Sequence, residues 1–157
     1  MITVWRMTTA RFAKSAFSGE GARLYGGRWN RKGIALVYTS QSQSLAMLEM
    51  LVQDDPLRAR YVMMAAHVPK GVAVARIKIV DLPPNWRDVA IHDKRQAIGT
   101  KWAIEGKTAI LEVPSAVVPS EFNYLLNPLH PDYRRIKIDQ PFKVTTDSRL
   151  LKSWAKM

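Results

Sequence analysis

The sequence contains no cysteine among its 157 residues, so disulfide bonds and thiolate-bound metals are excluded. It also contains no apolar run close to the ~20 residues that are needed to cross a bilayer. Residues 1–6 do not have the charged and then apolar layout of a secretory signal peptide. Together, these absences lead us to expect a soluble, cytoplasmic protein that has no association with a membrane.

Recognisable catalytic and metal-binding motifs are scarce as well. The three histidines, His67, His92 and His130, are scattered, and no pair of them has the spacing of metal ligands or of a catalytic triad. There is no Walker A loop, and no GxGxxG motif opens a helix after a strand. The sequence therefore predicts no metal centre and none of the common phosphate-binding loops.

Acidic residues are few: 13 Asp and Glu stand against 24 Lys and Arg, which gives a formal net charge of +11. This excess favours an anionic ligand, an acidic protein partner or nucleic acid. A basic surface that only aids solubility explains the charge equally well, because the charges do not form one block. Since no helix-turn-helix, zinc-finger or RNP pattern is visible, a nucleic-acid-binding module is the less favoured interpretation. The tryptophans are interpreted as packing residues rather than base-stacking platforms: Trp5, Trp29, Trp86, Trp102 and Trp154.

The length suits a single domain over residues 1–157, and 47% hydrophobic residues are enough for a core. Apolar runs predict strands at 2–7, 34–39, 60–68, 72–80 and 108–113, with one or two more within 134–145. Pro69-Lys70-Gly71, between the third and fourth of these strands, is typical of a hairpin.

Two helices are expected, one between an N-cap at 40–44 and a stop at Asp54-Asp55-Pro56, and one over 88–104. Segments 8–33 and 119–131 are expected to be loops. This order of elements predicts an α+β fold with a mixed, mainly antiparallel sheet that is flanked by helices.

The first of these helices carries an unexpected charge. Residues 44–52 hold one carboxylate, Glu49, among seven apolar side chains. Met47, Leu48, Leu51 and Val52 form a broad apolar arc, so we expect the helix to be largely buried, with Glu49 just past the edge of that arc. Because burial of an unpaired charge is costly, a half-buried carboxylate is expected to have a hydrogen-bonding or ionic partner or a functional role. Glu49 is therefore interpreted as a base, an electrostatic stabiliser or an anchor for a sugar hydroxyl, or alternatively as a flanking residue paired with an arginine.

An arginine follows directly after two glycines in the segment Gly26-Gly27-Arg28-Trp29-Asn30. The planar fork of the Arg28 guanidinium suits phosphate or carboxylate, although an arginine that braces the turn is the alternative. Arg6, at the end of the first strand, has the same ambiguity. Tyr38 closes a buried strand and is interpreted either as a ring that stacks on a ligand with its hydroxyl free, or as a core residue. Ser115 follows a strand and can reach a ligand or cap a turn.

These residues together form an ordered set along the chain, and this set resembles the RES domain, the toxin half of RES–Xre toxin–antitoxin pairs. The matching stretches are Trp5-Arg6, 26–30 with Gly33, 37–40, Leu45-Ala46 with Leu48-Glu49, Gly99 with Trp102, 113–115, Asn123-Tyr124, Asn127-Pro128 and His130-Pro131. They span nearly the whole chain in the expected order.

The resemblance implies a fold similar to that of ADP-ribosyltransferase toxins, with NAD bound as the substrate in a cleft and no metal. It implies that Arg28 and Arg6 hold the pyrophosphate or the neighbouring ribose and that Asn30 belongs to the same binding set. Tyr38 would face the nicotinamide, and Glu49 would stabilise the oxocarbenium-like ribosyl centre. Ser115 would assist binding or orient Glu49.

The resemblance also implies an activity and a partner. We expect a toxin that arrests growth by cleaving the nicotinamide–ribose bond of NAD, as a glycohydrolase or a phosphorylase. A mono-ADP-ribosyltransferase that modifies a cellular protein is the alternative, and a non-enzymatic protein that binds nucleic acid or an acidic partner through its basic surface is a weaker one. The expected partner is an Xre-type antitoxin that occludes the active site, and any contact with nucleic acid is expected only through this antitoxin.

Overall fold

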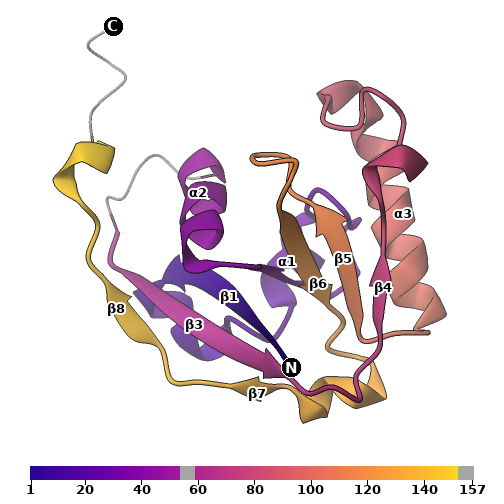
Figure 1. Cartoon of the computed structure of the whole chain (residues 1–157). Helices are drawn as coiled ribbons and strands as arrows, with labels where there is room; N and C mark the ends of the chain where they lie inside the picture. The colour runs from indigo at the N-terminus through magenta and orange to yellow at the C-terminus, as the bar shows by residue number, and fades with distance from the viewer. Residues whose placement is uncertain (54–58, 152–157) are drawn as a thin grey trace, which may run out of the picture.

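Strands of the chain form one curled, mixed sheet, seen in a computed structural model that describes residues 1–53 and 59–151 (Figure 1). The strands are β1 (Ile2–Thr9), β2 (Val37–Ser40), β3 (Tyr61–Val68), β4 (Val74–Arg76), β5 (Ile110–Pro114), β6 (Phe122–Leu126), β7 (Lys137–Ile138) and β8 (Phe142–Val144). Their order is β4-β5-β6-β2-β1-β3-β7, and β8 also pairs with β3. Only the β4–β5 pair is parallel among the pairs of the described residues. The predicted α+β class with a mainly antiparallel sheet is confirmed.

Helices flank this sheet: α1 (Glu20–Tyr25), α2 (Gln43–Gln53) and α3 (His92–Glu105). Short 3-10 turns connect the elements at Ala10–Ser15, Ile79–Asp81, Val89–Ile91, Pro131–Arg135 and Ser148–Leu151. Figure 1 shows α3 running along the β4 and β5 side, while α2 stands over the middle of the molecule. None of the helices in the described part of the chain is long and apolar enough to cross a membrane.

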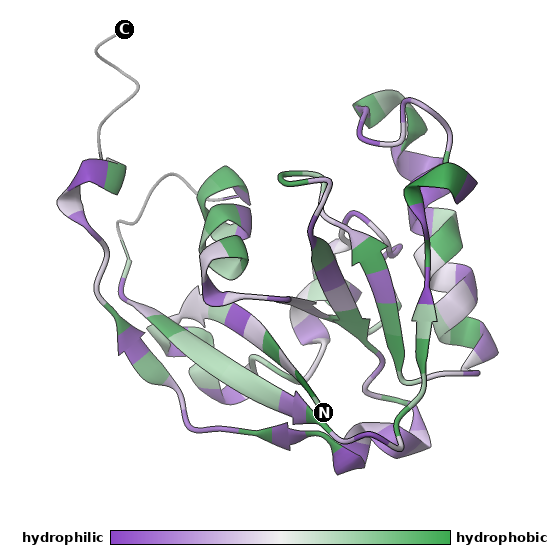
Figure 2. Ribbon diagram, viewed as in Figure 1, coloured by the Kyte–Doolittle hydropathy of each residue, from purple (hydrophilic) through white to green (hydrophobic). Residues whose placement is uncertain are grey.

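The core is divided between the two halves of the sheet. Three tryptophans, Trp29, Trp86 and Trp102, are buried with Leu111 and Leu125 where α3 covers β5 and β6. A separate cluster of Met7, Ala46, Tyr61 and Met63 lies where α2 packs on β1 and β3. Figure 2 shows the apolar colouring of α2 and of much of β3. Trp5 packs edge-on against Phe142, so these four tryptophans serve in packing as predicted, whereas Trp154 lies outside the described residues.

The junction between β1 and β2 is the weakest join of the sheet. In the described chain these strands share a single register pair, Trp5 with Ser40, whereas β1 pairs with β3 over eight residues and β2 pairs with β6 over four. Beyond that pair the strands diverge. Each strand is held from its far side by a longer ladder, β1 by β3 and β2 by β6.

Two expectations about the strands are wrong. Residues 60–68 and 72–80 do not form a hairpin, because β4 crosses to the far edge and pairs in parallel with β5, where Val74 and Ala75 pack against the core. The segment 119–131 is not a loop, because it contains β6, a strand between β5 and β2. The predicted loop 8–33 also contains the end of β1, the first 3-10 turn and α1.

The predicted burial of the first long helix is wrong in part. Leu45 and Ala46 are its buried residues, whereas Leu48 is 40% and Val52 63% exposed. The cause is that α2 rests on the sheet through the face that carries Ala46 and Met50, which is one position away from the apolar arc. The predicted stop at Asp54-Asp55-Pro56 lies outside the described residues.

Candidate functional site

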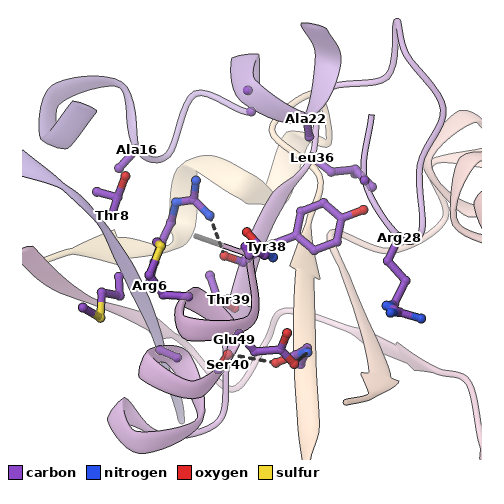
Figure 3. A pocket seen from close by; sticks show the side chains of 18 of the residues that line it. Arg6, Thr8, Ala16, Ala22, Arg28, Leu36, Tyr38, Thr39, Ser40 and Glu49 are labelled. Carbon is purple, nitrogen blue, oxygen red and sulfur yellow. Dashed lines mark hydrogen bonds between the residues drawn. The ribbon is translucent and has the colours of Figure 1, made fainter. Parts of the chain in front are cut away.

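A cavity of about 420 Å³ occupies the opening between β1 and β2. Its walls come from β1, α1, the loop that precedes β2, β2 itself and α2. Four of the predicted site residues line it: Arg6, Arg28, Tyr38 and Glu49. Figure 3 shows these four side chains around one space, each delivered by a different element. Residues that are 43 positions apart in sequence therefore converge as predicted.

Glu49 reaches the cavity from one face of α2. Ala46, Met50 and Gln53 line the cavity beside it, which is the spacing of one helical face. Its Oε1 accepts hydrogen bonds from the Ser115 hydroxyl at 2.8 Å and from the Asn123 amide at 2.7 Å. A carboxylate that accepts two donors is held in one orientation. The alternative that Glu49 is paired with an arginine is not what the structure has, because no arginine of the described chain lies within ion-pair distance of it.

Ser115 is fully buried just after β5 and does not line the cavity. Its Oγ accepts the backbone N–H groups of Val117 and Val118 at 3.1 and 3.0 Å. With its oxygen occupied as an acceptor, the hydroxyl proton is directed to Glu49. Ser115 thus contacts Glu49 and does not face the cavity, whereas its two expected roles stay predictions.

Arg6 extends from β1 across the opening. Its Nη1 donates to the backbone carbonyl of Tyr38 at 2.9 Å, which ties β1 to β2 where their ladder has ended. Its Nε is buried and has no hydrogen-bond partner among the described residues. Burial lowers the pKa of the Arg6 guanidinium, an effect that Tyr133 opposes more weakly. A buried cation that keeps an unpaired donor is stabilised by an anion placed beside it.

Arg28 lies on the opposite wall, in the loop between α1 and β2. Its Nη1 is buried and likewise has no partner in the described part of the chain. The loop is clamped on α3: the Gln96 amide donates to the carbonyls of Gly27 and Asn30, at 3.0 Å each. Gly99 permits this contact, because a Cβ there would overlap the Trp29 carbonyl oxygen. The arginine is thus presented by a rigid loop and not by a free one.

Tyr38 has its ring in the cavity wall, and its hydroxyl is paired, as expected of the core-residue alternative. The hydroxyl donates to Asn30 Oδ1 at 2.6 Å and accepts the Trp29 backbone N–H at 3.0 Å. Burial raises the pKa of the Tyr38 phenol far above its ordinary value, and the nearby Arg28 opposes this only weakly. Tyr38 therefore offers a neutral aromatic face and no proton acceptor. Gly27 must lack a side chain here, because a Cβ would lie 2.6 Å from that hydroxyl.

Asn30 is fully buried and lies behind Tyr38 instead of lining the cavity. Its Nδ2 donates to the carbonyls of Ala22, Arg31 and Ile34, and its Oδ1 accepts the Tyr38 hydroxyl. No polar atom of this amide is left for a ligand. These bonds place Asn30 in the loop that carries Arg28, and its expected part in binding stays a prediction that they do not favour.

Two residues of the site were not predicted. Asn123, in β6, lines the cavity and binds Glu49, and Gln96, on α3, holds the Arg28 loop. Asn123 belongs to a stretch that supports the family resemblance, and this was the one signal that could have singled it out. No group of three or more His, Asp or Glu side chains that could hold a metal is found within residues 1–53 and 59–151.

The fold and the site define a class of protein. It is an α+β protein with one sheet and with a cleft between β1 and β2. The cleft contains two arginines that keep unpaired donors and one carboxylate that is held by hydrogen bonds. The RES domain family matches residues 3–147, and the chain belongs to this family. The resemblance that the sequence suggested is confirmed.

Relatives cover nearly the whole chain. The chain is 36% identical over 156 residues to "Toxin Res" of Photorhabdus laumondii, covering 96% of this chain and 97% of the relative. It is 36% identical over 150 residues to "Toxin Res" of Yersinia enterocolitica, with 94% and 98% covered. It is 37% identical over 155 residues to "Prs ADP-ribosylating toxin" of Sphingobium sp., with 94% and 96% covered.

The fold has a counterpart among solved structures. A chain of the M. tuberculosis MbcT–MbcA toxin–antitoxin complex matches with a TM-score of 0.75 and 22% identity, covering 92% of this chain and 84% of that one. At this identity the likeness concerns the fold.

Proposed function

We propose that the protein is the toxin of a toxin–antitoxin pair and that it consumes NAD by breaking the nicotinamide–ribose bond. The observation that carries this proposal is the convergence of Glu49, held through Oε1, with Arg6 and Arg28, each of which keeps a buried unpaired N–H. A dinucleotide with two linked phosphates and a ribosyl centre that becomes cationic has the complementary charges.

Each residue has a distinct part in this reaction. Arg6 and Arg28 bind the pyrophosphate from opposite walls of the cleft, which holds the ribose in place. The face of Tyr38 packs against the nicotinamide ring, a flat pyridinium cation that an aromatic face attracts. As the C–N bond breaks and nicotinamide leaves with the bonding electrons, positive charge develops on the ribose. The Glu49 carboxylate stabilises that charge, and it does so without reorganising, because Ser115 and Asn123 already hold it.

Glu49→Gln is the decisive variant. The amide keeps the shape of the side chain but removes the charge, so NAD consumption should fall by about 10²- to 10³-fold, the usual loss for one preorganised electrostatic group. Purified protein with NAD labelled in its adenosine moiety gives the rate by chromatography, and thermal unfolding verifies that the variant folds. Glu105→Gln is the matched control, because Glu105 is an exposed glutamate at the end of α3 and does not line the cavity. Intact NAD with the wild-type protein would contradict the proposal.

The acceptor of the ADP-ribosyl group divides the proposal into three outcomes. Water gives free ADP-ribose, phosphate gives a phosphorylated product, and a protein acceptor gives label on a polypeptide. The name of the Sphingobium relative, an ADP-ribosylating toxin, favours the protein acceptor as the second candidate function. The same labelled substrate, incubated with and without phosphate and with a cell extract, separates the three.

An antitoxin is the proposed partner, of the Xre type and placed over the cleft. A toxin–antitoxin complex as the structural counterpart supports a protein partner for this fold. The excess of 24 basic over 13 acidic residues favours an acidic contact surface on that partner. We expect the purified complex to leave NAD intact and released toxin to consume it. Equal rates for the two would refute occlusion. A salt-sensitive gel shift by the isolated protein would instead support direct binding of nucleic acid.

A further inference from the structure

The two residues that donate hydrogen bonds to Glu49 come from neighbouring strands: Ser115 directly follows β5, and Asn123 lies in β6. In the β2–β6 ladder Ser40 lies opposite Asn123, and in the β5–β6 ladder Asn123 lies opposite Val113, two residues before Ser115. The Ser40 hydroxyl bonds to Asn123 Oδ1 at 2.8 Å, and Asn123 Nδ2 bonds to Glu49 Oε1 at 2.7 Å. A continuous path of hydrogen bonds therefore runs from β2 through β6 to the carboxylate on α2.

The direction of this path follows from the chemistry of its members. A side-chain amide has a donor end and an acceptor end of nearly the same shape, so packing alone does not choose between its two orientations. If the amide were reversed, Oδ1 would face the carboxylate oxygen and the two would repel. The hydroxyl of Ser40 can donate its proton to Oδ1, which favours the orientation in which Nδ2 faces Glu49.

We propose that Asn123 is a positioning residue for Glu49 and that Ser40 sets the orientation of the Asn123 amide. This inference rests on the proposed function, since it concerns the carboxylate of that reaction. Asn123 and Ser115 both donate to Oε1, and no described residue donates to Oε2. Oε2 is therefore the oxygen that is left to face the ribosyl centre. We call the path from Ser40 through Asn123 to Glu49 the relay, and its bond to Oε1 is what leaves Oε2 available.

Kinetics of three variants test the relay. In Asn123→Ala the charged acceptor loses one donor, so kcat for NAD consumption should fall about 10- to 100-fold, the equivalent of one hydrogen bond to a charged group. The KM for NAD should stay within about threefold, because Arg6 and Arg28 are unchanged. Ser40→Ala should lower kcat by less, and Ser40→Thr, which keeps the hydroxyl, should restore it. Ser120→Ala, an exposed serine just before β6, is the matched control.

The double variant distinguishes a relay from two separate contacts with the ligand, since Ser40 and Asn123 both line the cavity. If Ser40 acts only through Asn123, Ser40→Ala should have no further effect on kcat when Asn123 is already alanine. Additive losses in the double variant, or a KM that rises while kcat is kept, would overturn the proposal. Thermal unfolding of each variant shows whether the loss follows from misfolding.

A second measurement needs no substrate. The side-chain amide signals of Asn123 in a ¹H–¹⁵N NMR spectrum should move in Glu49→Gln and in Ser40→Ala, but not in Ser120→Ala. Unchanged signals in Ser40→Ala would refute the orienting role of Ser40. If the signals respond as expected but the wild-type protein leaves NAD intact, the proposed function fails and the positioning of Glu49 stands.

Discussion

Substitution of Gly99 by alanine tests how the Arg28 loop is held. Gly99 lies inside α3, where alanine is favoured over glycine by about 1 kcal/mol, so helix propensity alone predicts a more stable protein. The structure predicts the opposite. The new Cβ would overlap the carbonyl oxygen of Trp29 and lie 2.9 Å from its carbonyl carbon. Since ordinary C···O contacts are about 3.3 Å or longer, the loop has to retreat by roughly 1.4 Å.

The cost of that retreat can be estimated from the contacts it disturbs. Overpacking of a buried contact costs about 1–3 kcal/mol. The Gln96 bonds to Gly27 and Asn30, and the bond from the Arg31 N–H to Thr100 Oγ1, are stretched as well, at about 1 kcal/mol for each bond that is lost. After the gain in helix propensity, the net loss is about 2 kcal/mol. For a domain of this size the melting temperature should fall by about 4–8 °C.

Activity should fall together with stability, because the displaced segment carries Arg28. A shift of about 1 Å in a positioning residue can cost about 10²-fold in rate. Scanning calorimetry and NAD turnover below the melting temperature measure the two effects. Gly21→Ala is a matched control for the melting temperature alone, because a Cβ at Gly21, also in a helix, meets nothing within 4 Å but Gly21 lines the cavity. A Gly99→Ala protein that melts at or above the wild-type temperature with unchanged turnover would refute the argument.

Two further predictions concern charge. Arg28→Lys keeps the positive charge but loses the two-donor fork, so the KM for NAD should rise about tenfold. The exposed Arg149→Lys is the control and should leave the KM unchanged. The same KM in Arg28→Lys as in the wild-type protein would show that Arg28 does not bind the substrate. Alkaline pH should destabilise the protein, because burial raises the pKa of Tyr124 and of Tyr133 to about 12, whereas the unfolded chain ionises near ~10. The stabilisation is complete below pH ~10 and is lost as the pH rises towards ~12, which urea unfolding across this range measures. Phenolate absorbance that develops fully by pH ~10 in the folded protein would contradict it.

Much of the site could be predicted because its residues are unusual for their surroundings. Glu49 is a single charge in an apolar helix, and Arg28 follows two glycines. Such local contrasts are visible in one sequence. The sequence could not decide whether the Tyr38 hydroxyl is free or show how the Asn30 amide is bonded, because whether a polar group is already paired depends on neighbours that only the fold supplies.

The parts that were missed depend on contacts between distant residues. β6 is only five residues long and lies between Pro119 and Asn127-Pro128, so it has the composition of a loop, yet it pairs with β2 about 85 positions away. Gln96 acts on carbonyls that are 69 and 66 positions away. In the same way, the partner of β4 could not be predicted, because Pro69-Lys70-Gly71 has the composition of a hairpin turn whether or not the two strands pair.

The single register pair at Trp5 and Ser40 has a consequence for how such a protein can be controlled. Each wall of the cleft keeps its shape by bonding away from the cleft, β1 to β3 and β2 to β6, so the cleft is built before any ligand arrives. Under the proposed function, a cleft that is already formed needs no rearrangement before it acts. The proposed antitoxin would then have to cover the cleft in at least equal number, so that control of the proposed activity would depend on the ratio of the two proteins.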